Sequence, residues 1–229
     1  MEPLPPLDPD EKGNALLQHL VSGLHCSDRA SFVEKLTKQP LRERFHTYRE
    51  LLLGAQLRTT GADFRYEKNI NGKTPDWTLS IDGKLVEIID VVTLHQRNQK
   101  EIEITTATRS TNSWSGWISV PAKHIYRKLS DKSGQYSELA RNSQTPFVIA
   151  VFGDFLAAID PNEIDYVLYK YHEDDWEHKG WFPEFPEVSG LIYFREKNGD
   201  FEFIYFPNPH ALYPATWSSR VAHSPKPPA

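Results

Sequence analysis

The segment from Leu85 to Val92 constrains the fold more than any other part of the chain, because it is apolar on both faces. A strand of this kind belongs in the middle of a sheet that helices cover on both sides. The preceding pair Asp82-Gly83 favours a tight hairpin turn. The sequence therefore predicts a β-hairpin with strands at Asp76–Ile81 and Lys84–Thr93, inside an α/β domain with a mixed sheet.

Helices and further strands are expected on both sides of this hairpin. Apolar spacing predicts a helix at Leu41–Leu57, after two shorter N-terminal helices. The other expected elements are helices at Asn14–Leu24, Asp28–Lys38, Val120–Asn142 and Pro161–Glu177, a strand at Ala62–Lys68, a buried strand at Pro146–Phe152, and a C-terminal hairpin at Val188–Phe194 and Phe201–Phe206. The order from residue 41 to residue 152 is thus helix, three strands, helix, strand.

The 229 residues suffice for one domain, which we expect at 13–222 with a core at about 41–152 and an extension at 153–222. Prolines predict a disordered leader at 1–12 and a disordered tail at 223–229. A single cysteine, no signal peptide and no membrane-spanning apolar run together predict a cytoplasmic protein. The net charge of −5 argues against a protein that coats nucleic acid through its overall field.

Two carboxylates on the predicted hairpin are candidates for chemistry. Asp76 opens one strand after Pro75, and Glu87 lies inside the apolar strand, where an unpaired carboxylate is costly. If the hairpin brings them together, their repulsion favours a hard divalent cation such as Mg²⁺ between them. The alternative for Asp76 is a turn residue that binds nearby backbone N–H groups. Asp90 is expected on the opposite face from Glu87, as a satisfied polar residue or as the partner of a helix.

Pro75-Asp76, the gap to Glu87 and the αβββαβ order together resemble the PD-(D/E)XK nuclease superfamily, over roughly half of the chain. The resemblance implies a restriction-endonuclease-like core in which Asp76 and Glu87 hold Mg²⁺ or Mn²⁺. It implies that a metal-activated water hydrolyses phosphodiester bonds of a nucleic acid. It also implies a homodimer, because many enzymes of this superfamily dimerise to cut two strands.

The chain departs from the superfamily pattern at Ile89, where a lysine is expected two residues after the acidic residue. Lys132 is the candidate replacement, because it lies within the apolar stripe of the helix Val120–Asn142. Lys128 is the second choice. The alternative is that Lys132 extends its stem along the surface and places its ammonium in solvent.

Some members of the superfamily add a glutamate from the first core helix, and Glu50 is similarly placed. The helical wheel puts it away from the main apolar stripe, so it is either a third metal ligand or an exposed helix charge.

Contacts to a nucleic-acid strand are expected from basic, aromatic and polar residues around the second core helix. These residues are Arg97, Lys100, Arg109, Trp114, Lys123 and Gln135. The tryptophans of this region could instead anchor the loop to the core. Two other functions stay open: a catalytically inactive module that binds nucleic acid or protein, and a structural subunit of a larger assembly.

Overall fold

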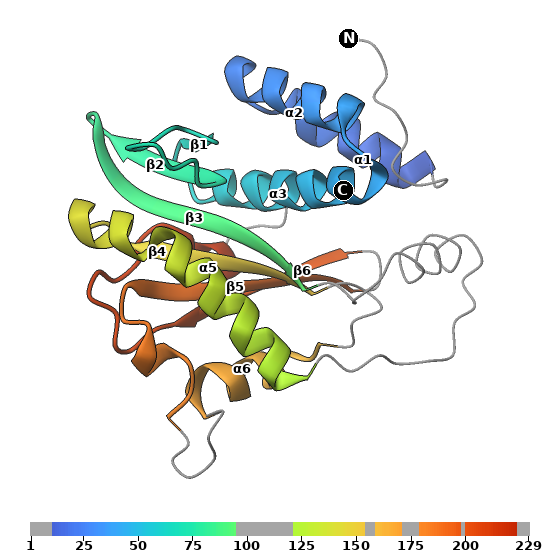
Figure 1. Cartoon of the computed structure of the whole chain (residues 1–229). Helices are drawn as coiled ribbons and strands as arrows, with labels where there is room; N and C mark the ends of the chain where they lie inside the picture. The colour runs from blue at the N-terminus through green and yellow to red at the C-terminus, as the bar shows by residue number, and fades with distance from the viewer. Residues whose placement is uncertain (1–10, 95–120, 154–158, 171–178, 198–199, 224–229) are drawn as a thin grey trace, which may run out of the picture.

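Six strands form one mixed sheet in the order β1-β2-β3-β4-β5-β6 (Figure 1). β2 is antiparallel to both of its neighbours, β1 and β3; β3, β4 and β5 are parallel, and β6 is antiparallel to β5. The strands are β1 (Phe64–Tyr66), β2 (Trp77–Ile81), β3 (Lys84–Leu94), β4 (Phe147–Gly153), β5 (Val188–Lys197) and β6 (Asp200–Pro207). This computed structural model describes residues 11–94, 121–153, 159–170, 179–197 and 200–223.

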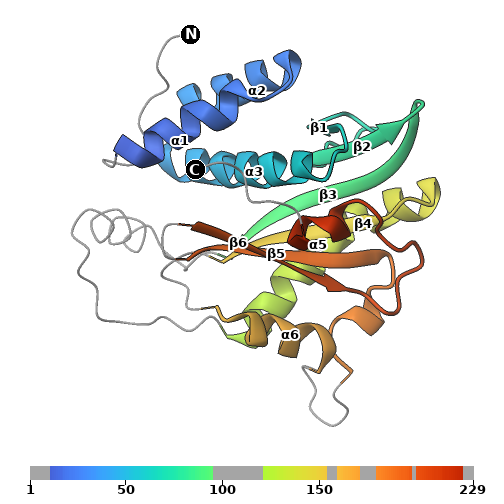
Figure 2. The same cartoon turned by 180° about the vertical axis from the view of Figure 1, so that it is seen from behind.

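Helices cover both faces of the sheet, as Figures 1 and 2 show from opposite sides. The three N-terminal helices lie over one face, and α5 and α6 lie over the other. The helices are α1 (Glu11–Ser22), α2 (Cys26–Lys38), α3 (Leu41–Thr59), α5 (Ala122–Ser143) and α6 (Pro161–Tyr169), with short 3₁₀ helices η1 (Phe182–Glu184) and η2 (Ser218–His223). The α/β class and the mixed sheet are therefore confirmed.

β3 is the central strand that its apolar pattern predicted. Ile89 and Val91 pack into the core beneath α3, whereas Ile88 and Val92 pack into the core beneath α5. All four side chains are at most 8% exposed. The two carboxylates of this strand, Glu87 and Asp90, are buried with it.

The β2–β3 hairpin turns at Asp82-Gly83 as predicted, with φ angles of 51° and 75°. Its register then shifts by one residue: Ser80 pairs with Leu85, but Leu79 pairs with Glu87. Val86 is thus the extra residue of a β-bulge. Beyond a bulge, every side chain of the strand faces the side opposite to the one that an unbulged hairpin would give.

The order α3-β1-β2-β3-α5-β4 agrees with the predicted sequence of core elements. The boundary of the leader is wrong by two residues, because α1 begins at Glu11. The helix expected at Pro161–Glu177 ends at Tyr169, and residues 171–178 lie outside the described part of the chain, as do 1–10 and 224–229. Within the described residues, no helix has the length and apolarity needed to cross a membrane.

Candidate metal site

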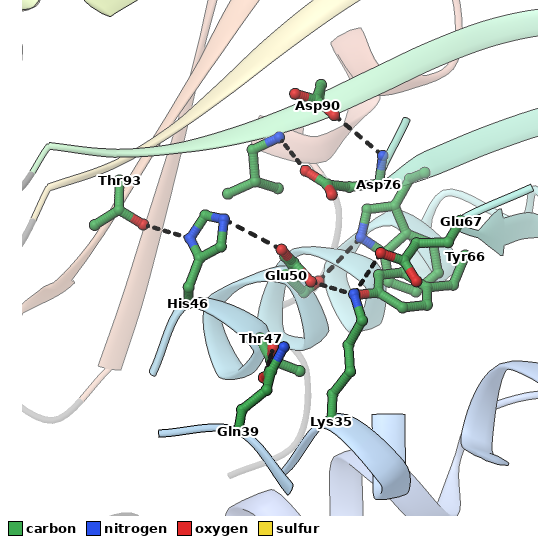
Figure 3. A network of polar contacts seen from close by, with 12 residues as sticks. Lys35, Gln39, His46, Thr47, Glu50, Tyr66, Glu67, Asp76, Asp90 and Thr93 are labelled. Atoms are coloured by element: carbon green, nitrogen blue, oxygen red, sulfur yellow. Dashed lines mark hydrogen bonds and ion pairs between the residues drawn. The ribbon is translucent and has the colours of Figure 1, made fainter. Parts of the chain in front are cut away.

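Asp76 and Asp90 lie side by side where β2 begins, because the bulged register pairs Trp77 with Ile89. The backbone N–H of Asp76 donates to Oδ1 of Asp90 over 3.2 Å. The backbone N–H of Val91 donates to Oδ2 of Asp76 over 2.6 Å, as Figure 3 shows. Backbone donors therefore fix one oxygen of each carboxylate, and with it the orientation of the side chain.

Lys132 reaches this pair from α5. Its ammonium forms an ion pair with Oδ2 of Asp90, and its side chain is 20% exposed whereas that of Asp90 is 1% exposed. Oδ2 of Asp90 is buried, and the ammonium of Lys132 compensates its charge there. One turn further along α5, the hydroxyl of Tyr136 donates to the carbonyl of Thr74 over 3.2 Å.

Glu50 approaches the same place from α3, on the other face of the sheet. The hydroxyl of Tyr66 donates to its Oε2, and Nε2 of His46 lies 3.2 Å from its Oε1. The indole N–H of Trp77 donates to the backbone carbonyl of Glu50 over 3.0 Å, which ties α3 to the start of β2. Glu50 is only 4% exposed, so the alternative of an exposed helix charge is wrong.

The two partners of Glu50 are themselves held in place (Figure 3). The ammonium of Lys35 on α2 donates to the hydroxyl of Tyr66 over 2.8 Å and forms an ion pair with Glu67. Nδ1 of His46 lies 3.0 Å from the hydroxyl of Thr93 on β3. Four elements of the fold thus converge on the Glu50 carboxylate.

Burial and mutual repulsion make the ionised carboxylates costly. Burial raises the pKa of Glu50 to about 7, although the Tyr66 hydroxyl and the Lys35 charge act against this rise. Burial also raises the pKa of Asp76 well above its usual range, and the charges of Glu50 and Asp90 raise it further. Lys132 and the Val91 N–H act in the opposite direction. A bound cation would relieve this cost, because it favours the ionised carboxylates.

The donors at this place suit a hard divalent cation. Mg²⁺ and Mn²⁺ prefer carboxylate oxygens and keep several water ligands, so one or two carboxylates per ion suffice. Asp76 and Asp90 offer such a pair, and a cation there would share Asp90 with the ammonium of Lys132. Across the described ranges, no group of three or more His, Cys, Asp or Glu side chains is arranged to hold a metal ion. The site is therefore an aspartate pair and not a cage of protein ligands.

Glu87 does not take part in this arrangement, and the predicted convergence of Asp76 with Glu87 is wrong. Its fully buried carboxylate accepts three backbone N–H groups at the start of η2, from Thr216 at 3.4 Å, Trp217 at 3.0 Å and Ser218 at 2.8 Å. Without the bulge at Val86, the hairpin would place Glu87 on the face of Asp76. The bulge turns Glu87 to the opposite face and brings Asp90 to Asp76 instead.

The other predicted site residues that the structure describes do not contact the carboxylates of Glu50, Asp76 and Asp90. Lys123, Lys128 and Gln135 are exposed on α5, and Lys128 forms no ion pair with Glu50, Asp76 or Asp90. Arg97, Lys100, Arg109 and Trp114 lie outside the described residues.

Sequence reasoning missed Asp90, Tyr66, Lys35 and His46 as parts of the site. Asp90 was expected only as a satisfied polar residue or as the partner of a helix on the face opposite to Glu87, and its ion pair with Lys132 of α5 confirms the helix partner. Nothing local marks the residues around Glu50, because Lys35 and Tyr66 come from separate elements.

No family model, no curated protein and no solved structure matches this chain.

Proposed function

We propose that the protein is a metal-dependent nuclease that hydrolyses phosphodiester bonds of nucleic acid. One observation carries the proposal: Asp76, half-buried just before β2, and Asp90, buried on β3, are oriented by backbone N–H groups, and the ammonium of Lys132 lies against Asp90. Two carboxylates and a lysine at such a place are the parts needed to hold a divalent cation and to meet a phosphate.

The resemblance to PD-(D/E)XK nucleases supports the proposal once Asp90 replaces Glu87 in the motif. Pro75-Asp76 opens β2, Asp90 lies on β3, and the core elements follow in the αβββαβ order. The position two residues after the acid is then Val92, which packs beneath α5 and cannot supply the lysine. Lys132 of α5 supplies an ammonium to Asp90 in its place.

The roles follow from the chemistry of each side chain. The cation, held by Asp76 and Asp90, would supply a Lewis acid and a water of lowered pKa. Lys132 would donate to the scissile phosphate and offset the negative charge that develops on it. Glu50 would add a negative charge near Asp76 and hold Tyr66 and His46, which engage both of its carboxylate oxygens.

The substrate class rests on the resemblance and on charge. At a net charge of −5 the chain repels polyanions at long range, so local cations must provide the attraction. Mg²⁺ at the aspartate pair and the ammonium of Lys132 would do so. We place the activity in the cytoplasm, because the single cysteine fits a reducing compartment.

Cleavage assays with single- and double-stranded DNA and RNA, with Mg²⁺, Mn²⁺ or EDTA, test the proposal. We expect cleavage only with the metal, and a loss of at least about 100-fold in Asp76→Asn and Asp90→Asn. Both variants keep the shape of the side chain and remove its charge. Metal-dependent cleavage that survives in both variants would refute the assigned site.

A second function is favoured by Val92: a module of the same fold that binds nucleic acid or protein without cleaving it. Its site would lack the lysine of the β3 strand, and its buried carboxylates would be structural. Binding of an oligonucleotide without cleavage under any metal condition would support this function over the nuclease.

A further inference from the structure

Residues 67–74 form a tight turn that joins β1 to β2, named here the β1–β2 turn. Asn71 and Gly72 lie at its tip, with φ angles of 53° and 82°. The backbone N–H of Ile70 donates to the carbonyl of Lys73 over 2.8 Å, and that of Lys73 donates to the carbonyl of Ile70 over 3.0 Å. These two bonds close the turn and give its backbone a defined shape.

The β1–β2 turn is held against the candidate metal site. Ile70 is half-buried and packs into the core beneath α5. The hydroxyl of Tyr136 on α5 donates to the carbonyl of Thr74 over 3.2 Å. The backbone N–H of Glu67 donates to the carbonyl of Asp76 over 3.0 Å. The turn therefore keeps a fixed position beside Asp76, on the side of the sheet that α5 covers.

Two lysines give the β1–β2 turn a positive charge. Lys73 is exposed and forms no ion pair with any residue that the structure describes. Lys68 is also exposed, and its ammonium donates to the neutral hydroxyl of Ser80 over 3.1 Å. The single acid of the turn, Glu67, forms an ion pair with Lys35 (Figure 3). The turn thus presents two positive charges to solvent on a chain whose net charge is −5.

The candidate metal site itself is rich in negative charge. The carboxylates of Glu50 and Asp90 lie close enough to Asp76 to raise its pKa. Lys132 offsets part of this charge through its ion pair with Asp90, and the charge of Lys35 acts in the same way on Glu50. A polyanion that approaches the three carboxylates is repelled by the charge that remains, so cations at the edge of the site favour its binding.

We infer that the β1–β2 turn binds the phosphate backbone of a nucleic acid, with Lys68 and Lys73 each contacting a phosphate beside the bond that is cleaved. This inference rests on the proposed function and adds to it the surface on which the substrate lies. Lysine binds phosphate as a point charge, so these contacts hold the backbone without reading the sequence of bases. Gly72 leaves room for a close approach, because no atom lies within 4 Å of a Cβ built at this position.

Fluorescence anisotropy of labelled single- and double-stranded oligonucleotides, in EDTA and at low salt, tests this surface without any cleavage. Lys68→Gln and Lys73→Gln should each weaken binding by about threefold or more, and the double variant by about tenfold or more, because each loses one phosphate contact. The slope of log affinity against log salt concentration should become shallower by about 0.9 per lysine for duplex DNA and by about 0.7 for single strands.

Lys84→Gln is the matched control, because Lys84 is exposed at the start of β3, at the far end of the β2–β3 hairpin. It should bind as the wild type does, and circular dichroism should show that every variant is folded. A double variant with the affinity and the salt slope of the wild type would overturn the inference and leave the nuclease proposal standing. A wild type that binds through the turn but shows no metal-dependent cleavage would overturn the nuclease proposal and leave the surface standing. A wild type that binds no oligonucleotide would overturn both.

Discussion

The ammonium of Lys132 on α5 lies against the carboxylate of Asp90 on β3. The helix thus supplies the positive charge that no lysine on the strand provides. α5 carries its apolar stripe along the face that covers the sheet, and Lys132 is the charged residue within that stripe. A buried ammonium is tolerated there because Asp90 compensates it.

Lys132→Met tests this pair. We expect cleavage to fall by about 100-fold with the metal still bound, because methionine keeps the stem but cannot donate to a phosphate. Lys128→Met is the control, since Lys128 lies one turn away on the same helix and is exposed. Equal losses in the two variants would contradict the role of Lys132.

The stability of the metal-free protein should depend on pH through Glu50. Its pKa is about 7 in the folded chain against an ordinary value of 4.5 for a glutamate, so folding favours the protonated form. The stability from this group is present in full below about pH 4.5 and is lost as the pH rises through about 7. The pKa difference corresponds to about 3 kcal/mol.

Glu50→Gln removes this dependence, because the amide does not titrate. We compare the free energies of unfolding of the variant and the wild type by urea unfolding in EDTA. The difference, variant minus wild type, should rise by about 2–3 kcal/mol between about pH 4.5 and pH 8. Groups far from Glu50 cancel in the comparison of the two proteins, whereas Asp76, whose pKa the Glu50 charge raises, adds to the difference in the same direction. A constant difference in free energy of unfolding across this pH range would refute the shifted pKa of Glu50.

Glu87 should matter for stability and not for metal. Glu87→Ala leaves the N–H groups of Thr216, Trp217 and Ser218 without their acceptor, at a cost of about 2–4 kcal/mol in the free energy of unfolding. Mn²⁺ affinity at a temperature where the chain is folded should be unchanged. Glu34→Gln is the control, because its ion pair with Lys38 is fully exposed and its loss should leave the free energy of unfolding nearly unchanged.

Gly54 keeps α3 close to the start of β2. A Cβ at this position would lie 1.9 Å from the Trp77 ring, which is too near for any contact. Gly54→Ala should therefore lower the free energy of unfolding by about 1–3 kcal/mol and weaken Mn²⁺ binding, because Trp77 is next to Asp76.

Gly134→Ala on α5 is the matched control for that substitution. No atom lies within 4 Å of the added Cβ, and alanine favours a helix by about 1 kcal/mol over glycine. Thermal unfolding should show a small gain in stability for this variant and a loss for Gly54→Ala. A gain in both would show that the Trp77 contact does not limit the packing.

Sequence patterns predicted the elements of the core but not the face on which one carboxylate lies. The apolar run of β3 and the Asp82-Gly83 turn located the hairpin, since both act over a few residues. The bulge at Val86 turns the side chains beyond it to the opposite face of the sheet, and no residue type in the sequence predicts a bulge at that position. Asp90 could therefore not be preferred to Glu87 from the pattern alone.

The surroundings of Glu50 escaped prediction for another reason. The wheel of α3 indicated one buried stripe, but α1, α2 and η2 pack on the sides that the sheet leaves open, and α3 is buried on all sides from residue 49 to residue 57. Its second face depends on residues far apart in sequence, such as Lys35 and Tyr66. Lys132 was found because the spacing within one helix is a local signal.

Mg²⁺-dependent cleavage by Asp90→Asn and Glu87→Gln, compared with the wild type in one assay at a temperature where all three are folded, tests the account most directly. The account predicts that Asp90→Asn loses cleavage and that Glu87→Gln keeps it. Cleavage retained by Asp90→Asn and lost by Glu87→Gln would contradict the site.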